Sequence, residues 1–200
     1  RRYGRAADRV TAADVVLATG EIVRASAASH PELLWALKGG SGNFGIVTSI
    51  EFGLVPVHSV FGGTVMYPLA KAPRVLDAFA RWVKAAPEDI TATITFLRLP
   101  SRPGLPPQLR GAEIVMIRAC AVGDLEAGEA AIAPLRSLGT PIMDTFAVLP
   151  YTRIGEISHS GKTSSPARAT TVMLRDLDDS TLATLLEVAG PGVETPVMSI

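Results

Sequence analysis

Glycines that follow a predicted helix are the first residues whose spacing suggests chemistry. Residues 40–45 read Gly-Ser-Gly-Asn-Phe-Gly and satisfy G-x-G-x-x-G, a pattern that binds dinucleotides when a strand precedes it and a helix follows it. Here the order is reversed, because the helix comes first and a strand follows Gly45. No helix N-terminus would point at a phosphate, so the context argues against a Rossmann fold.

Outside a Rossmann fold, the same glycines can serve a ligand or only the backbone. Gly39, Gly40, Gly42 and Gly45 leave the backbone bare over seven residues, so the loop can approach a ligand closely and offer N–H groups to an anion. Alternatively, the glycines end the helix and form a turn that leads into the strand. The spacing alone favours this second, structural role.

A second glycine-containing segment resembles a phosphate-binding loop without fitting its spacing. The run GEISHSGKTSS spans residues 155–165, with five residues between Gly155 and Gly161. A Walker A loop has four, and an additional residue would misplace the N–H groups that hold the β-phosphate. We therefore interpret the segment as a polar loop with a solvated Lys162, which could also border an active site.

Metal and thiol chemistry have little support. His30, His58 and His159 are far apart in the sequence and lie on different predicted elements, so none is spaced for a metal site. The single cysteine, Cys120, excludes an internal disulfide and a multi-thiolate site. We interpret it as a small strand residue. Asp178 and Asp179 are better placed to cap a helix than to catalyse.

The elements that position the glycine loop follow from local signals. A hairpin is predicted around Thr19-Gly20, where Gly supplies a positive φ. A short helix is predicted over residues 31–38, with Ser29 as its cap and Gly39 as its end. The strand after Gly45 should then alternate. One side would carry Ile46, Thr48, Ile50, Phe52 and Leu54, and the other Val47, Ser49, Glu51 and Gly53.

The pattern changes at Pro56, and a domain boundary is predicted within residues 55–59. Beyond it, helices are predicted near residues 71–86, 125–138 and 179–189. The predicted strands cover residues 61–69, 90–99, 112–122, 141–149 and the run ETPVMSI at 194–200. Paired strands with covering helices indicate an α+β fold with an antiparallel or mixed sheet.

The overall composition is that of a globular protein. Hydrophobic residues make up 48% of the 200 residues, and 19 basic residues balance 19 acidic ones. There is thus no electrostatic indication of nucleic acid or an anionic membrane as a partner. No apolar run is long enough to span a bilayer, and the N-terminal residues do not form a signal peptide. We expect a cytoplasmic location and an internal piece of a longer polypeptide.

The run from Ala13 to Val57 resembles a known family in a long, ordered motif. His30-Pro-Glu-Leu-Leu-Trp-Ala-Leu-Lys-Gly-Gly-Ser-Gly-Asn-Phe-Gly-Ile-Val-Thr48 is similar to the end of the FAD-binding domain in FAD-linked oxidases of the berberine bridge enzyme type, within the vanillyl-alcohol oxidase (PCMH-type) superfamily. Residues 1–10 resemble the segment before the hairpin. Residues 58–200 are consistent with the start of that family's substrate domain, less distinctively.

The resemblance implies a fold and a cofactor site. Residues 1–57 would be the C-terminal lobe of a PCMH-type FAD-binding domain, and residues 58–200 part of an α+β substrate-binding domain. The loop would pass beside FAD and contact it through six residues: Gly42, Asn43, Phe44, Gly45, Ile46 and Val47. Trp35 and Phe44 would pack beneath the loop. Family motifs for covalent flavin attachment and the main pyrophosphate loop have no counterpart here.

The resemblance also implies an activity. The parent protein would be an oxidase that oxidises an alcohol or amine C–H of a small molecule by hydride transfer to FAD, with oxygen as reoxidant. The fragment alone would be inactive. No catalytic residue matches by motif, although Tyr67, Tyr151, Arg98 and Arg118 could face a substrate. A dehydrogenase that excludes oxygen and a non-enzymatic binding module are the alternatives. Substrate identity and oligomeric state stay open.

Overall fold

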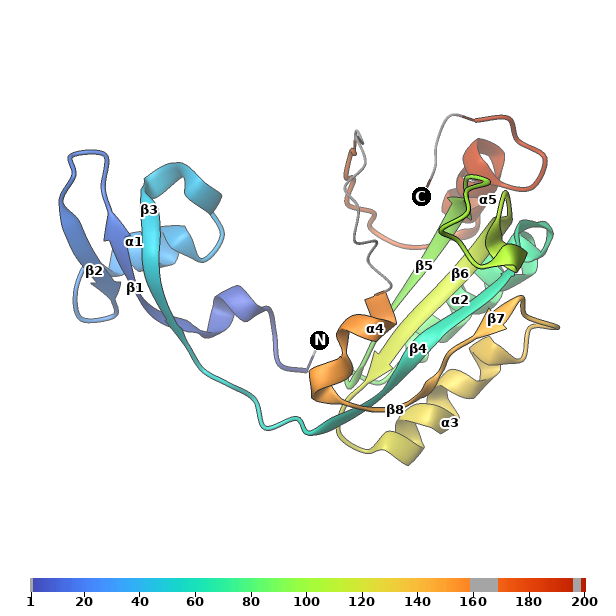
Figure 1. Ribbon diagram of the computed structural model, residues 1–200, viewed down its shortest axis with the longest axis horizontal. Coiled ribbons are helices and arrows are strands. Elements are labelled where there is room, and N and C mark those ends of the chain that lie inside the picture. Colours follow the sequence, from blue (N-terminus) through green and yellow to red (C-terminus); the bar gives the residue numbers. More distant parts are fainter. Residues whose placement is uncertain (1, 159–168, 196–198) are drawn as a thin grey trace. The chain divides into compact units, whose positions relative to one another are not determined.

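The computed structural model describes residues 2–158, 169–195 and 199–200. The chain divides into two compact units, Arg1–Pro56 and Val57–Ile200, which we call the N-terminal and C-terminal units. Each unit combines an antiparallel sheet with helices (Figure 1). The predicted α+β class is therefore confirmed.

The N-terminal unit is a three-stranded sheet with one short helix. Its elements are η1 (Ala6–Arg9), β1 (Val10–Val16), β2 (Ile22–Ser26), α1 (Pro31–Leu37), η2 (Ser41–Phe44) and β3 (Ile46–Phe52). The strand order is β2-β1-β3. Five buried residues form a small core between α1 and the first two strands: Ala13, Val15, Val23, Ala25 and Leu34.

The hairpin and the helix lie where the sequence places them, but the helix begins differently. Gly20 has φ +86°, and its N–H donates to Leu17 O at 2.9 Å, which closes the predicted turn. The N-cap of α1 is His30, not Ser29, because His30 adopts the left-handed conformation with φ +51° and provides no side-chain cap. The Ser29 hydroxyl instead lies 3.0 Å from His30 Nδ1. The predicted Ser29 cap is therefore wrong.

A β-bulge changes which residues of β3 share a face. Asp14 pairs with Ser49 and Val15 pairs with Val47, so Thr48 is an additional residue on β3. The Thr48 hydroxyl donates to Asp14 O at 3.3 Å. Since paired residues point to the same side of a sheet, Val47 joins Ile50 on the side of Ala13 and Val15. The predicted strict alternation along this strand is therefore wrong beyond the bulge.

The C-terminal unit is built on a larger sheet. Its strands are β4 (Ser59–Pro68), β5 (Ile90–Arg98), β6 (Glu113–Ala121), β7 (Met143–Asp144) and β8 (Ala147–Pro150), and its α-helices are α2 (Ala72–Ala85), α3 (Leu125–Arg136), α4 (Gly155–Ser158) and α5 (Asp179–Ala189). The order is β5-β6-β4-β7, and β8 also pairs with β4. The 3-10 turns are η3 (Leu69–Lys71), η4 (Pro107–Leu109) and η5 (Tyr151–Arg153).

Helices α2 and α3 cover one face of this sheet, and α5 packs against α2 (Figure 1). The strands supply apolar residues to this layer, among them Val65, Val115 and Ile117, which are fully buried. Tyr67 is also fully buried there, and its hydroxyl donates to Leu135 O at 2.9 Å. This hydrogen bond therefore connects strand β4 to the end of helix α3.

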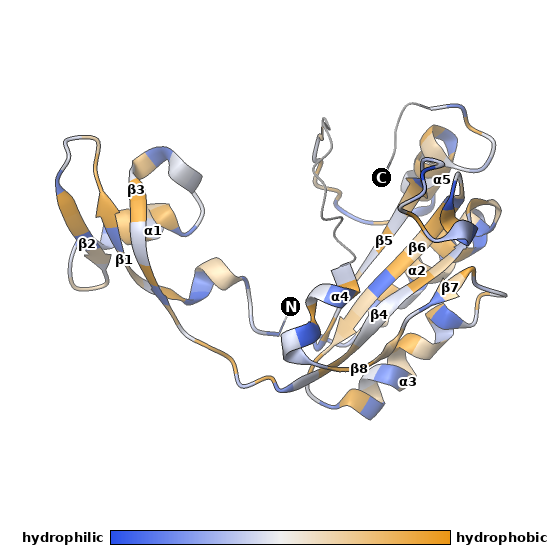
Figure 2. Cartoon of the chain, in the orientation of Figure 1, coloured by the Kyte–Doolittle hydropathy of each residue, from blue (hydrophilic) through white to orange (hydrophobic). Residues whose placement is uncertain are grey.

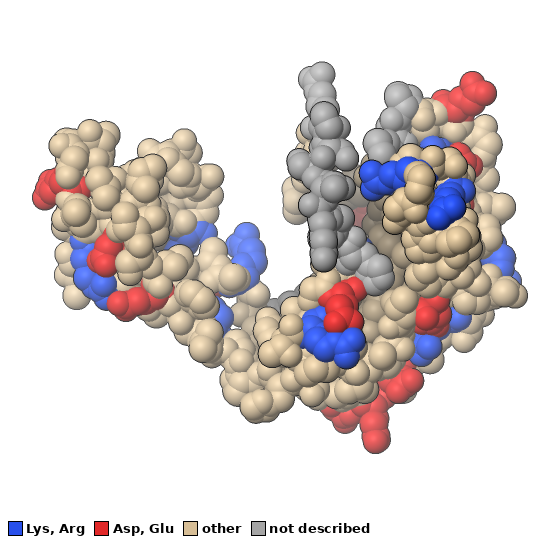
Figure 3. Space-filling view, viewed as in Figure 1, with Lys and Arg blue, Asp and Glu red and all other residues tan. Residues whose placement is uncertain are grey.

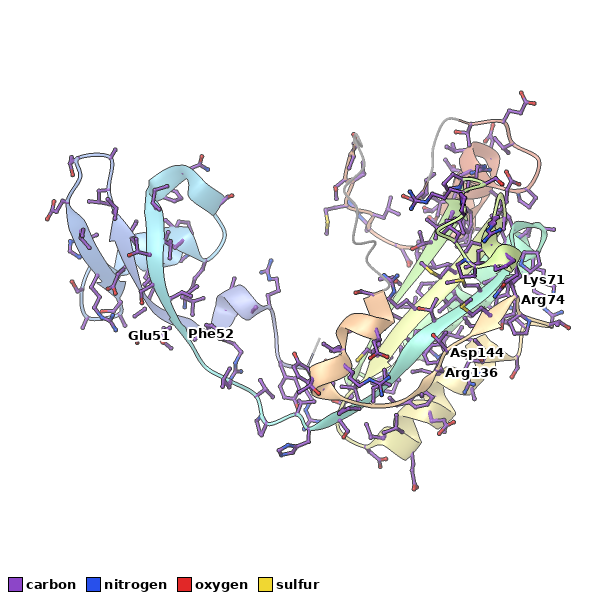
Figure 4. All side chains as sticks on the ribbon, in the orientation of Figure 1. Glu51, Phe52, Lys71, Arg74, Arg136 and Asp144 are labelled. Carbon is purple, nitrogen blue, oxygen red and sulfur yellow. The ribbon has the colours of Figure 1, made fainter. Side chains whose placement is uncertain are left out.

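One predicted strand, residues 141–149, is two strands in the structure. The chain turns at Thr145-Phe146, where the Phe146 N–H donates to the Asp144 carboxylate at 3.0 Å. A Cβ on Gly63 would lie 2.5 Å from Phe146 Cα, so glycine at this point of β4 lets the crossing chain approach. Arg136 of α3 donates to Asp144 at 2.8 Å and fixes β7 to the helix (Figure 4).

The last predicted strand is only partly described. Phe96 N–H donates to Ile200 O at 2.9 Å, and Ile200 N–H returns a bond to Phe96 O at 3.2 Å. Residues 199–200 therefore pair with the outer edge of β5, while residues 196–198 lie outside the described residues.

Candidate cofactor-binding site

The glycine loop joins the end of α1 to the start of β3. Helix α1 ends at Leu37, with Lys38 as its C-cap. The 3-10 turn η2 then covers Ser41–Phe44. Strand β3 begins directly after Gly45, so the segment runs from helix to strand as the sequence predicts. The Rossmann geometry is absent from this loop, since a strand and not a helix follows the glycines.

The four glycines have two different structural reasons. A Cβ on Gly40 would lie 2.6 Å from Ala36 O, and one on Gly45 would lie 2.5 Å from Val16 O. Gly45 also has φ +138°, which side chains rarely adopt. By contrast, a Cβ on Gly39 or Gly42 would have no heavy atom within 4 Å. Internal packing thus explains Gly40 and Gly45 but not Gly39 or Gly42, and only Gly42 of these two lines the pocket described below.

Two side chains hold the loop in shape. Asn43 Nδ2 donates to Gly40 O at 2.7 Å, and the Phe44 ring packs against Gly40. The amide of Asn43 therefore uses one donor within the loop. Trp35, by contrast, is 76% exposed, so the prediction that it packs beneath the loop is wrong.

A pocket of about 340 Å³ lies beside the loop. It is lined by Val10, Ala13, Leu37, Ser41, Gly42, Gly45, Ile46, Val47 and Ile50. Four of the six predicted cofactor residues are therefore brought together at one cavity, namely Gly42, Gly45, Ile46 and Val47. Asn43 and Phe44 do not line it. Aliphatic side chains form most of the wall, and the loop backbone supplies the polar groups.

Sequence reasoning missed the far wall of this pocket. Val10 and Ala13 of β1 and Ile50 of β3 line it because the strands pair, Ala13 lying opposite Ile50. Part of the signal is present in the sequence, since the hairpin around Thr19-Gly20 predicts β1 as a strand. The pairing of β1 with β3, however, links residues almost 40 positions apart and cannot be read locally.

Strand β3, which contributes to the pocket wall, contains several hydrophobic residues (Figure 2). All seven of its residues are exposed, including Ile46 at 70%, Ile50 at 53% and Phe52 at 53%. Leu54, just beyond the strand, is 80% exposed. Contiguous apolar surface of this kind marks binding or interaction sites in soluble proteins.

A cluster of three charged side chains of the N-terminal unit lies on the opposite side of the sheet from the pocket. Arg24 of β2 donates to Glu51 of β3 at 2.6 Å and to Asp14 of β1 at 3.3 Å. The hydrogen bond to Glu51 is the main cause that raises the pKa of Arg24. In Figure 3 the acidic and basic side chains of this unit are grouped together, and much of its other visible surface is uncharged. No Lys or Arg lines the pocket.

The candidate substrate-facing residues of the C-terminal unit separate into two classes. Tyr67 is buried beneath the helices, and burial raises the pKa of its hydroxyl. Arg98 Nη2 donates to three carbonyl oxygens around the end of α5, those of Ala189, Gly190 and Val193, and its Nε donates to Glu113. Both residues therefore have structural roles. Tyr151, 49% exposed, and Arg118 are the two that solvent can reach.

The remaining candidate residues are the cysteine, the segment that resembles a phosphate loop, and possible metal ligands. Cys120 lies on β6 as predicted, and burial raises the pKa of its thiol. In the segment that resembles a phosphate loop, Gly155–Ser158 form α4, while His159 and Lys162 lie outside the described residues. Among the described residues, no group of His, Cys, Asp or Glu could hold a metal ion. No helix in this part of the chain is long and apolar enough to cross a membrane.

Known proteins provide an independent comparison. No family model matches the chain. The chain is 30% identical to (R)-6-hydroxynicotine oxidase of Paenarthrobacter nicotinovorans over 161 residues, which is 76% of this chain and 32% of the relative. It is 27% identical to an FAD-linked oxidoreductase of Dictyostelium discoideum over 156 residues, or 77% of this chain and 31% of the relative. The chain thus spans about a third of the length of these relatives.

Solved structures agree with the sequence relatives. The structure of 6-hydroxy-D-nicotine oxidase from Arthrobacter nicotinovorans superposes with a TM-score of 0.66 and 25% identity, covering 81% of this chain and 35% of that one. Berberine bridge enzyme has the same fold over 74% of this chain and 28% of its own, with a TM-score of 0.55 and 20% identity.

These likenesses define the class first. The helix–glycine loop–strand arrangement and the superpositions are those of VAO-type flavoproteins. Within that class, the chain is similar to FAD-linked oxidases and oxidoreductases of the berberine bridge enzyme type. The resemblance stated from the motif of residues 30–48 is thereby confirmed, and the homologues are FAD-linked oxidases and oxidoreductases.

Proposed function

We propose that the chain is part of an FAD-dependent oxidase and forms one flank of its cofactor site. In this proposal residues 1–57 are the C-terminal lobe of the FAD-binding domain, and residues 58–200 are part of the substrate-binding domain. The substrate is a small molecule whose C–H next to a hydroxyl or amine is oxidised. FAD would supply the redox chemistry when bound, and the loop residues of this chain would hold one side of it.

The observation that carries this proposal is the open side of Gly42. A side chain there would meet no atom of the chain within 4 Å, yet Gly42 lines the pocket. A glycine without an internal packing reason, at the rim of a cavity in a family of flavoproteins, is explained by close approach of a ligand. The fit is chemical as well, because the aliphatic walls suit one side of a flat heterocycle.

The residues of the loop divide the work of binding. The backbone of Gly42, Gly45, Ile46 and Val47 offers polar groups to the cofactor, while the side chain of Val47 forms part of the wall. Asn43 and Phe44 act by holding Gly40 and the turn in place. Both residues therefore keep the loop rigid. In this proposal the side-chain oxygen of Asn43 contacts the cofactor.

The chain by itself binds FAD weakly and is inactive in this proposal. The pocket is bounded by one loop and two strands, and the apolar face of β3 has no cover among the described residues. A complete flavin site requires a second surface that excludes solvent. Tight, stoichiometric binding of FAD to these 200 residues would contradict this part of the proposal.

The first test is the visible absorption spectrum of the purified parent polypeptide, taken before and after acid precipitation. Flavin bands establish the cofactor, and colour that remains in the pellet shows covalent attachment. A polypeptide that stays colourless after incubation with FAD contradicts the flavoenzyme and favours a non-enzymatic binding module. Where flavin is present, stopped-flow reoxidation by oxygen separates an oxidase from a dehydrogenase.

Two matched variants of the parent test the role of the loop itself. Gly42→Val places a side chain at the pocket rim, and Gly39→Val places the same side chain in equally open space outside the pocket lining. Overpacking against a ligand costs about 1–3 kcal/mol, so we expect Gly42→Val to weaken FAD binding about tenfold or more. Gly39→Val should leave it unchanged. Equal effects of the two variants would remove the argument from Gly42.

A further inference from the structure

The sheet of the C-terminal unit has a second face, on the side away from α2 and α3. The pairing of β6 with both neighbours places Arg118 between Thr64 of β4 and Thr93 of β5. Because residues paired across antiparallel strands point to the same side, these three side chains form one row on this face. In the next row Cys120 lies between Gly62 and Thr91.

Helix α4 covers the β4 side of this face and is held there by the row itself. The Thr64 hydroxyl, fully buried, donates to Ile157 O at 3.3 Å. Arg118 Nη2 donates to Ser158 O at 2.8 Å. The Ile157 side chain packs on Gly62, where a Cβ would be only 2.5 Å away. The β5 side stays open, since Thr91 is exposed and Thr93 is also exposed.

Arg118 forms no ion pair with an acidic residue of the described chain. No Asp or Glu pairs with it among the residues the structure describes, and residues 159–168 and 196–198 contain no Asp or Glu at all. Its Nε atom is shielded from solvent and has no hydrogen-bond acceptor. The one acceptor of Arg118 that the structure gives, Ser158 O, is a neutral carbonyl and does not balance the charge of the guanidinium.

Three other arginines of this unit pair with an acidic side chain in place. Arg98 pairs with Glu113 at 3.1 Å, Arg136 with Asp144 at 2.8 Å, and Arg153 with Glu156 at 2.6 Å. Arg118 differs from them in lying on an open sheet face between two threonines with only a carbonyl as partner. The charge of Arg118 is therefore available to an anionic group beside the exposed Thr93.

We propose that the row Thr93–Arg118, beside the α4 carbonyls, binds a carboxylate group of a small-molecule ligand. A guanidinium matches a carboxylate in shape and charge, and the Thr93 hydroxyl adds a neutral donor. One cation balances a singly charged carboxylate, whereas a phosphate dianion needs more. The inference rests on the proposed function in one respect. If the chain is part of an oxidase, the ligand is its substrate or product, and that molecule carries a carboxylic acid group.

The alternative is that Arg118 only fastens α4 to the sheet. In that case a carboxylate gains nothing over a neutral molecule of the same shape, and the positive charge is dispensable once α4 is held. Benzoate and benzamide differ in charge and hardly in shape, so the pair separates the two roles. The full 200-residue chain is used, because the C-terminal unit alone has not been shown to fold.

The experiment is a titration of the ¹⁵N-labelled chain with benzoate and, separately, with benzamide, followed by amide chemical shifts at low ionic strength. We expect saturable shifts at Thr93, Arg118 and Ser158 with benzoate, and binding of benzamide about tenfold weaker or more, since charged hydrogen bonds are worth more than neutral ones. Added salt should weaken the benzoate shifts. Equal affinity for both probes, or no saturable shift in this row, overturns the proposal.

Variants add a second, independent readout. Arg118→Met keeps much of the aliphatic stem and removes the charge, so benzoate binding should fall about tenfold or more. Thr93→Val keeps the shape and should weaken binding about threefold. Arg81→Met is the matched control, because Arg81 is exposed on α2 and pairs with Asp77. Unchanged benzoate binding in a folded Arg118→Met overturns the proposal. Should that variant not fold, the comparison of benzoate with benzamide on the unaltered chain decides.

This outcome is independent of the flavin. The titration needs no FAD, and FAD binding is measured at the glycine loop with the Gly42→Val and Gly39→Val pair. Failure of the carboxylate site with FAD bound to the parent leaves an oxidase of a neutral substrate. Failure of FAD binding with a working carboxylate site contradicts the proposed function and leaves a module that binds acids.

Discussion

Strand β4 of the C-terminal unit and strand β3 of the N-terminal unit use similar residue types in opposite ways. From Val60 to Tyr67 every residue of β4 is buried. All seven residues of β3 are exposed, although Ile46, Val47, Ile50 and Phe52 are as apolar as the residues of β4. The difference lies in what surrounds each strand, not in the composition of the strand.

The surroundings explain the contrast. Strand β4 is central, with β6 on one side, β7 and β8 on the other, and α3 against it. Strand β3 is an edge of its three-stranded sheet, and α1, only seven residues long, packs on β1 and β2. The C-terminal unit therefore covers its own apolar surface. The N-terminal unit places apolar surface where a cofactor or another chain segment would cover it.

The largest expected effect comes from equal truncations in the two units. Ile117→Ala removes a fully buried side chain from β6, and we expect a loss of about 3 kcal/mol in the free energy of unfolding. Ile50→Ala removes the same atoms from a side chain that is 53% exposed, and should cost less than about 0.5 kcal/mol. Urea unfolding followed by Trp82 fluorescence reports on the first variant, and amide signals of β3 report on the second.

This comparison fails if the two truncations cost similar amounts. A large cost of Ile50→Ala would show that β3 is already covered in the isolated chain. Trp35 is 76% exposed, so its emission should stay near that of free tryptophan in both variants and serves as an internal control.

A smaller effect separates the glycines of the loop. Gly45→Ala forces a side chain into φ +138° and against Val16 O, which should destabilise the N-terminal unit by about 1–3 kcal/mol. Gly42→Ala meets no atom within 4 Å, so its cost should stay within about 0.5 kcal/mol. Hydrogen exchange of the β1 and β3 amides measures both. A Gly42→Ala as damaging as Gly45→Ala would assign Gly42 a packing role.

The smallest effect is a pH dependence at the start of α5. Asp178 caps this helix, and the hydrogen bond from the Thr181 N–H is the main cause that lowers the pKa of its carboxyl. A lowered folded pKa means that the cap stabilises above the unfolded pKa of about 3.9 and is lost as the pH falls through the lower folded value. Helix α1, whose N-cap has no side-chain bond, should show no such loss.

Asp178→Asn is the matched control, because asparagine caps helices without titrating in this range. Exchange of the first α5 amides, compared between about pH 5 and about pH 2.5, should accelerate in the unaltered chain relative to Asp178→Asn. Identical pH profiles for the two proteins would show that Asp178 contributes no pH-dependent stability.

Local signals in the sequence are sufficient for much of the fold. The hairpin at Thr19-Gly20, the helix after His30 and the helix at Asp179 are predictable because turn glycines, Pro at a helix start and capping acids act over a few residues. Strands β5 and β6 are also predictable from local sequence, because both are rich in β-branched residues. The family motif then identifies the loop of residues 40–45 as the candidate site.

Features that depend on distant partners are not predictable in this way. The bulge at Thr48 depends on pairing with Asp14, and it moves Val47 to the face of the pocket. The break at Thr145-Phe146 depends on Gly63, more than 80 positions earlier. The surroundings of Arg118 can be recognised only when β4, β5 and β6 are aligned. Its neighbours on the sheet face, Thr64 and Thr93, come from the other two strands and not from the local sequence.

The free edge of β3 also matters while the protein is being made. A ribosome completes residues 1–56 before any of the C-terminal unit, and the nascent segment then carries an unpaired, apolar strand edge. Such an edge is a template for pairing with a second nascent chain. Glu51, held by Arg24 on that strand, is the charged residue that opposes this pairing. Until the edge is covered, a chaperone that binds extended apolar segments has its natural target here.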